Sequence, residues 1–129
     1  MTYPTEKAMD FLNRALSLPA TGREQDWDIE LADPTRASEF ISYLEHQSLN
    51  GDEKRALMAL VLGSLDALAQ EEAIAPELWD RVVRLLQADR VLYADIVEPW
   101  KSGVLENGEP DGFAISSLID SLRAGWPLL

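Results

Sequence analysis

The chain has 129 residues, with 23 Asp and Glu against 11 Lys and Arg, one His and a formal net charge of −12 at pH 7. Because cysteine is absent, disulfides, thiolate zinc sites, iron–sulfur clusters and cysteine nucleophiles are excluded. The chain has no basic cluster to neutralise phosphates, which argues against binding to nucleic acid or an anionic membrane and favours a basic protein partner.

The bulk composition is typical of one folded domain spanning residues 1–129. Hydrophobic residues make up 47% of the chain, whereas disordered chains combine high net charge with low hydrophobicity. The segment Met1–Lys7 lacks a basic region followed by an apolar stretch, so it does not resemble a signal peptide. The longest apolar run, Ala56–Leu62, is far shorter than the roughly 20 residues that span a bilayer. We therefore expect a soluble, cytoplasmic protein.

Helical periodicity dominates the chain and predicts an all-α single-domain bundle of five to six helices. The first helix is predicted over Thr5–Leu18, with its apolar residues on one stripe and Pro19 as its stop. A turn is expected at Thr21–Glu24. Asp33-Pro34 should begin another helix, because Asp is a good N-cap and Pro suits the first helical position, and Asn50-Gly51 should end it.

A central helix is predicted at about residues 52–70. Asp52 and Glu53 would open it, because acids complement the positive end of the helix dipole. The stretch from Ala56 to Leu62 is apolar on every side of a helix, which indicates burial all round. Charged residues return only at Asp66.

The second half of the chain should contain two or three further helices. Ala75-Pro76-Glu77 begins a helix that either continues or breaks near Asp89. Residues 101–112 contain three glycines and a proline, which predicts a loop. A final helix follows, and Ser117 with Asp120 three residues later resembles a capping box near its start.

Acidic and apolar residues alternate strictly over Asp26–Leu31, which is the period of a strand. A lone strand has no obvious pairing partner here, so we expect either a short extended segment against the bundle or one helical turn leading to Asp33. In the extended form, one face would pack on the core and the other would present an acidic ridge to water. The core face would be Trp27, Ile29 and Leu31, and the ridge would be Asp26, Asp28 and Glu30.

Two segments begin like an EF-hand calcium loop, which needs Gly at its sixth position and a bidentate Glu at its twelfth. The segment that starts at Asp26 has apolar residues at both positions. The segment that starts at Asn107 has Gly112 at the sixth position but Leu118 at the twelfth. Neither segment satisfies the pattern, so no metal site is predicted.

No catalytic signature occurs in the sequence, and we expect neither an enzyme nor a cofactor. There is no nucleophile elbow, no phosphate-binding glycine loop and no zinc-protease motif. His46 lies near a predicted helix end, where a cationic side chain complements the negative end of the dipole. Paired carboxylates could still perform acid–base chemistry, although spacing along the chain cannot place two of them across a substrate.

The acids are concentrated in three stretches, Glu24–Asp33, Asp66–Asp80 and Asp95–Asp111. Together these stretches hold 15 of the 23 acids and one of the 11 bases. Trp27 and Trp100 each lie in one of them, and each is either an aromatic anchor for a partner or a cover over the core. The predicted partner-binding residues are Asp26, Trp27, Asp28, Glu30, Asp33, Trp100, Glu106, Glu109 and Asp111.

A small, cysteine-free, strongly acidic and helical chain resembles the immunity proteins that neutralise bacterial toxins. The resemblance lies in the stretches 26–34, 53–58 and 112–116 and in the order of the segments, and it assigns no role to any residue. It implies an inhibitor that occupies a basic toxin surface through carboxylates and aromatic rings. The alternative is a structural or scaffolding subunit, in homodimeric form if one face of the apolar helix at 56–62 is exposed.

Overall fold

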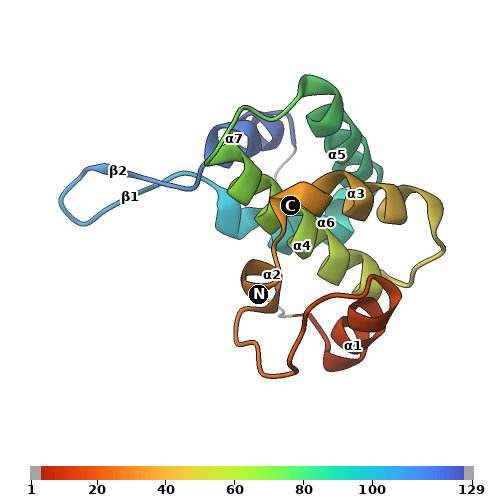
Figure 1. The fold of residues 1–129 in the computed structure, drawn as a ribbon. Helices are drawn as coiled ribbons and strands as arrows, with labels where there is room; N and C mark the ends of the chain where they lie inside the picture. The colour runs from red at the N-terminus through yellow and green to blue at the C-terminus, as the bar shows by residue number, and fades with distance from the viewer. Residues whose placement is uncertain (1–3, 127–129) are drawn as a thin grey trace.

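Helix α4 (Gly51–Ala69) lies at the centre of the computed structural model, which describes residues 4–126 (Figure 1). The segments packed against it are α1 (Glu6–Ala15), α2 (Trp27–Glu30), the 3₁₀ turn η1 (Pro34–Arg36), α3 (Ala37–His46) and α6 (Arg90–Val97). Helix α5 (Pro76–Ala88) packs on α3 and α6, and α7 (Ser116–Ala124) buries Ile119 and Leu122 in the same core. The predicted all-α bundle around a central helix is confirmed, although the described residues form seven α-helices rather than the predicted five to six.

The chain starts α4 with a complete capping box. The side chain of Asn50 accepts the backbone N–H of Glu53 at 2.8 Å, and Glu53 Oε1 accepts the N–H of Asn50 at 3.0 Å. The prediction that Asn50-Gly51 ends the preceding helix is therefore wrong, because Asn50 satisfies free N–H groups of the following helix instead. Every residue from Ala56 to Asp66 is buried, which the apolar sequence predicts as far as Leu62 and does not predict for the polar Ser64 and Asp66.

Helix α1 ends at Ala15, earlier than the predicted Leu18. Ser17 adopts a left-handed conformation with φ of 51°. The N–H of Leu18 then bonds to the carbonyl of Asn13 at 2.9 Å, and the N–H of Ser17 bonds to the carbonyl of Arg14. This is a Schellman motif, so the helix is closed by its own backbone before Pro19 is reached.

The segment from Asp33 begins as a 3₁₀ turn and continues as α3. Asp33 Oδ1 accepts the backbone N–H of Thr35 at 2.9 Å, which confirms the expected cap. Helix α3 ends at His46, whose ring Nδ1 lies 2.9 Å from the carbonyl oxygen of Ser42 in the last turn. The exposed His46 therefore lies at the helix end, as predicted.

Of the two alternatives for Asp26–Leu31, the structure adopts the helical turn, α2. Trp27 and Leu31, four residues apart, are buried, whereas the Ile29 side chain is 50% exposed. The extended alternative, with Ile29 on the core face, is therefore wrong, because a helical turn brings residues i and i+4 to one face. Asp26, Asp28 and Glu30 accordingly do not form the ridge of an extended strand.

The segment 76–100 breaks once, and the break separates two helices. Asp89, with φ of −148° and ψ of 62°, lies between α5 and α6 and gives the break that was one of two predicted alternatives. A 3₁₀ turn, η2 (Glu98–Trp100), follows α6. No helix within residues 4–126 is long and apolar enough to cross a membrane.

The predicted loop at 101–112 contains a small antiparallel sheet, β1 (Gly103–Val104) and β2 (Pro110–Asp111). Figure 1 shows this hairpin projecting from the body of the bundle, beside α7. The capping box predicted from Ser117 and Asp120 is not formed, because α7 begins at Ser116 and Asp120 bonds to the base of the hairpin.

Candidate protein-binding hairpin

A tight turn at residues 105–109 closes the hairpin. The N–H of Gly108 bonds to the carbonyl of Leu105 at 2.9 Å, and the N–H of Leu105 bonds to the carbonyl of Glu109 at 2.8 Å. Gly108 has φ of 86°, and Asn107 Oδ1 accepts the N–H of Glu109 at 3.0 Å. This is the three-residue hairpin loop in which a type I turn is followed by a left-handed glycine.

The hairpin is exposed along its whole length. Residues 101–109 and 111–114 are all exposed, and Pro110 is described only by its backbone. Three apolar side chains are among them: Val104 is 72% exposed, Leu105 46% and Phe113 52%. Val104 and Leu105 are held away from the core, so a partner that covered them would bury apolar surface.

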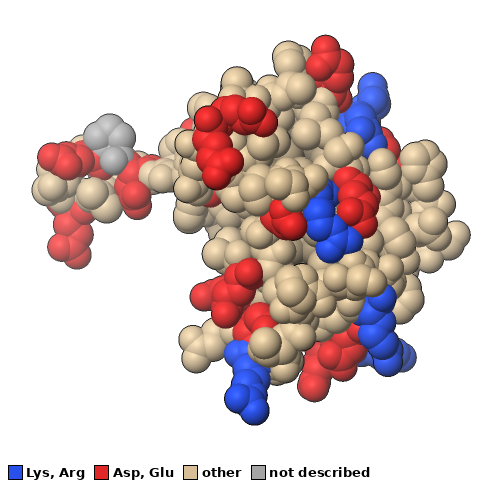
Figure 2. Space-filling view, in the orientation of Figure 1, with Lys and Arg blue, Asp and Glu red and all other residues tan. Residues whose placement is uncertain are grey.

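Three predicted site residues, Glu106, Glu109 and Asp111, lie on this hairpin. Within the described part of the chain, none of them makes an ion pair. Lys101, the only base in the stretch, pairs with Glu98, and this hydrogen bond lowers the pKa of Glu98 below its ordinary value. Figure 2 shows the hairpin carrying acids and, in that view, no base.

Two polar side chains of α7 hold the base of the hairpin. Ser116 Oγ accepts the N–H of Phe113 at 2.7 Å and donates to the carbonyl of Trp100 at 2.8 Å. Asp120 Oδ1 accepts the N–H of Ser102 at 3.1 Å, and hydrogen bonding to Ser102 lowers the pKa of Asp120. Both strands are therefore fixed where they leave the bundle.

The two tryptophans predicted as candidate anchors are buried. Trp100 is 5% exposed, and its ring meets that of Phe113 edge-on with centroids 4.8 Å apart. Trp27 is 2% exposed, and its ring N–H donates to Asn13 Oδ1 at 2.9 Å. Both rings therefore cover the core, and neither presents a face to a partner.

The acids around α2 have local roles. Glu30 Oε2 accepts the N–H of Asp26 at 2.8 Å, and Asp33 caps η1. Asp28 is half-buried, and burial raises the pKa of its carboxyl above the ordinary value. Of the predicted residues in this segment, Asp26 and Glu30 are exposed, and Asp28 and Asp33 are partly covered.

One stripe of α4 positions both α2 and the hairpin. A Cβ built on Gly63 would lie 2.6 Å from the carbonyl oxygen of Asp28, so α2 packs directly on the backbone of α4. Asp66, three residues further on the same face, accepts the N–H of Ile115 at 3.1 Å. Helix α2 and the chain that leaves the hairpin are thus anchored to neighbouring positions of the central helix.

The three acidic stretches do not merge into one patch. Asp66 is buried, and Asp95 pairs with Arg55. Figure 2 shows acids distributed over the visible face, with bases among them on the body of the bundle. On the hairpin, Glu106, Glu109 and Asp111 make no ion pair within the described structure, and they lie on one projecting element.

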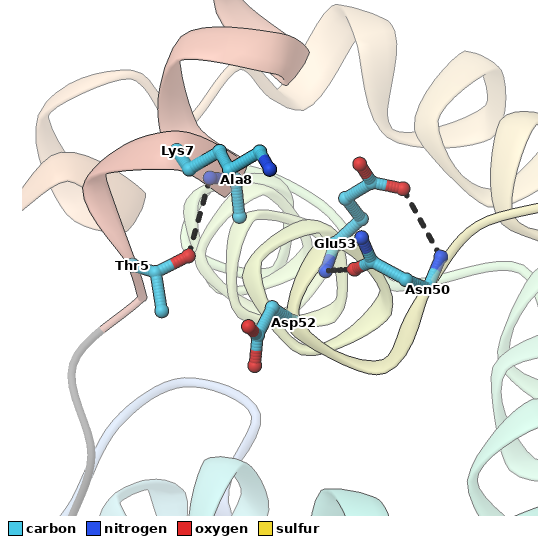
Figure 3. Close-up of a pocket in the computed structure, with 6 residues that line it drawn as sticks. All are labelled: Thr5, Lys7, Ala8, Asn50, Asp52 and Glu53. Atoms are coloured by element: carbon cyan, nitrogen blue, oxygen red, sulfur yellow. Dashed lines mark hydrogen bonds between the residues drawn. The ribbon is translucent and has the colours of Figure 1, made fainter.

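A shallow pocket of about 260 Å³ lies between the first turns of α1 and α4 (Figure 3). Its polar lining is engaged in helix capping: Thr5 Oγ1 accepts the N–H of Ala8, and Asn50 and Glu53 form the capping box. Lys7 and Asp52 contribute opposite charges to it. Sequence reasoning missed this pocket, which joins two segments far apart in the chain and contains no nucleophile–base pair.

Within residues 4–126, no three His, Asp or Glu side chains are grouped so that they could hold a metal ion. One local signal could have located the hairpin: Asn107-Gly108, the dipeptide most typical of tight hairpin turns. The roles of Ser116 and Asp120 have no such signal, because their partners lie far along the chain. Comparison of the chain with protein-family models, with curated proteins and with solved structures found no match.

Proposed function

We propose that this chain is a protein-binding module whose acidic hairpin, residues 101–114, contacts a basic surface of a partner protein. The observation that carries the proposal is the combination of three acids without ion pairs and exposed Val104 and Leu105 on one projecting element. Acids attract a basic surface, and apolar side chains gain free energy when the partner covers them.

The anchored base of the hairpin supports this role. A contact element that is already ordered loses less conformational entropy on binding than a flexible loop does. Ser116 and Asp120 provide this order by fixing the two strands where they join the bundle. The net charge of −12 accelerates encounter with a basic partner, and salt should slow that encounter.

The form of binding that we propose is inhibition of the immunity type, in which the chain occupies a basic surface of a toxin or effector. The resemblance in charge, size and helical character supports this form. The scaffolding alternative depended on an exposed face of the apolar central helix, and residues 56–66 are buried within the chain. We therefore give preference to the inhibitor.

Photo-crosslinking from two matched positions tests the hairpin as the contact. A benzophenone amino acid is placed at Val104 in one variant and at Val91 of α6 in the other; both wild-type side chains are largely exposed, at 72% and 80%. Irradiation in the source cells should join a basic protein to the Val104 variant and much less of it to the Val91 variant. Equal crosslinking from both positions would contradict a hairpin contact.

A charge-matched pair of variants tests the electrostatic component. Glu106→Gln, Glu109→Gln and Asp111→Asn together remove three charges from the hairpin, and Glu71→Gln, Glu72→Gln and Glu77→Gln remove three exposed charges elsewhere. The hairpin variant should lose the crosslink at Val104, and the control should keep it. For the inhibitor form, the reading frame beside the gene should encode a toxin whose toxicity the wild-type chain suppresses and the hairpin variant does not.

A further inference from the structure

The hairpin has one open backbone edge. Antiparallel strands alternate between residue pairs that exchange hydrogen bonds and pairs that do not. Because Leu105 bonds to Glu109, and Val104 lies opposite Pro110 in the next pair, Val104 belongs to a pair without hydrogen bonds. Its N–H and C=O groups therefore face away from β2, along the outer edge of β1.

The opposite edge is less suited to pairing. Pro110 is the residue of β2 whose backbone faces outward, and proline has no N–H to donate. Just before β1, the N–H of Ser102 already donates to Asp120. The part of the outer edge that remains available therefore begins at Val104 and runs toward the turn. The edge of β1, which has both an N–H donor and a C=O acceptor at Val104, is therefore the better edge for a further strand.

A sheet of two short strands is incomplete in physical terms, because three or more strands with a covered apolar face are normally needed for stability. Val104 is 72% exposed, and its side chain would lie beside those of an added strand. A second copy of this chain is a poor candidate for that strand. Pairing two copies would bring together two hairpins that each carry Glu106, Glu109 and Asp111, and like charges repel.

We propose that the free edge of β1 pairs with an extended, basic strand of the partner, which adds a third strand to the hairpin next to Val104. This inference rests on the proposed function and specifies how the partner is held. Backbone hydrogen bonds to Val104 would provide the register, and Lys or Arg side chains at alternate positions would face Glu106 and its neighbours.

Two synthetic peptides of identical charge test strand addition to the full-length chain. The first is acetyl-Lys-Val-Lys-Val-Lys-Val-Lys-amide, and the second has N-methyl groups on its valines and lysines, which removes the N–H donors along both edges. Titration is followed at low salt by NMR and by amide hydrogen exchange. The first peptide should slow exchange of the Val104 N–H by at least about tenfold at saturation, and the methylated peptide should leave it unchanged.

Variants at one position separate pairing from charge. Val104→Pro removes the N–H at the open edge, and Val104→Thr keeps it with a similar β-branched shape. The first peptide should bind the Thr variant as it binds wild type and should bind the Pro variant at least about tenfold more weakly, a difference that corresponds to 1.4 kcal/mol. The backbone NMR signals of the bundle show that each variant is folded.

The outcomes distinguish this inference from the proposed function. Equal binding of both peptides, or binding without protection of Val104, overturns strand addition. Failure of both peptides to bind at low salt also overturns it. The proposed function is judged separately, by crosslinking of the native partner at Val104. Dimers that Val104→Pro dissociates would overturn the inference in favour of self-pairing.

Discussion

The carboxylate of Asp66, buried in α4, accepts the backbone N–H of Ile115 at the start of α7, 49 residues later in the chain. The same carboxylate accepts the side-chain amide of Gln70 at 3.1 Å. This one side chain therefore connects the central helix to the chain that leaves the hairpin.

Replacing Asp66 with Ala should destabilise the fold, because the buried N–H of Ile115 loses its acceptor. Leaving such a donor unsatisfied costs about 1–3 kcal/mol, and urea unfolding measures this loss. Asp66→Asn is the matched control, because its amide oxygen can still accept the hydrogen bond. The free energy of unfolding should therefore fall less in this variant than in Asp66→Ala. An Ala variant as stable as wild type would show that water replaces the carboxylate.

Gly63→Ala should destabilise the chain although alanine is a better helix former than glycine. The new Cβ would lie 2.6 Å from the carbonyl oxygen of Asp28, so α2 must move away from α4. Overpacking of this kind costs about 1–3 kcal/mol, again measured by urea unfolding. Gly51→Ala is the control, because its Cβ would meet Leu92 Cδ1 at an ordinary 3.5 Å; equal effects would contradict the close contact.

Gly108→Ala should weaken the hairpin turn without unfolding the bundle. Gly108 has φ of 86° and no neighbouring atom within 4 Å of a built Cβ, so the cost is purely conformational. A left-handed alanine costs about 1–2 kcal/mol, whereas asparagine tolerates this region better. NMR contacts between Leu105 and Glu109 should therefore weaken in the Ala variant more than in Gly108→Asn. If Gly108→Ala also lowered the free energy of unfolding of the whole chain, the hairpin would unfold together with the bundle, and the prediction would be wrong.

The stability of the chain should depend on the ionisation of Asp28. Burial raises the pKa of Asp28, whereas the backbone N–H groups of Asp28 and Ile29 act in the opposite direction. The folded state therefore binds this proton more tightly than the unfolded state, and stability is lost as the pH rises through the ordinary pKa of about 3.9 to the raised value.

Asp28→Asn removes this ionisation and should raise the free energy of unfolding at neutral pH. The gain should disappear below the ordinary pKa, where both states of the wild-type carboxyl are protonated. Denaturant unfolding as a function of pH measures it, and Asp80→Asn, at an exposed position of α5, is the control. A gain at Asp28 that is independent of pH would assign the effect to hydrogen bonding rather than to charge.

The parts of the fold that sequence reasoning located are those with strong local signals. The apolar run of α4 and the Ala75-Pro76 start of α5 depend on neighbours within a few residues, and the structure contains both. Helix ends were harder. Ser17 closes α1 through backbone hydrogen bonds that propensity does not show, whereas Asn50 with Glu53 three residues later is a capping-box pattern that the sequence does show and that sequence reasoning missed. The dipeptide Asn107-Gly108 indicates a hairpin turn. The glycines and the proline around it led to the prediction of a loop instead.

In the candidate site too, local sequence patterns predict some features, and others depend on contacts between distant residues. Glu106, Glu109 and Asp111 were predicted from charge, and the structure shows that they are exposed, as a short acidic segment rich in Gly should be. The burial of Trp27 and Trp100 depends on contacts with Asn13 and Phe113, which no local pattern reveals. Exposure of Val104 could not be predicted either, since valine in a strand is more often covered by neighbouring elements.

The separation of the hairpin from the core has a consequence for sequence divergence. Residues 103–109 contribute no side chain to the buried cluster, whereas Ser116, Asp120 and Asp66 hold the base from within the bundle. Substitutions at the tip can therefore accumulate without disturbing the packing of the bundle. Related chains should share the bundle and its three anchoring side chains and differ most at the tip.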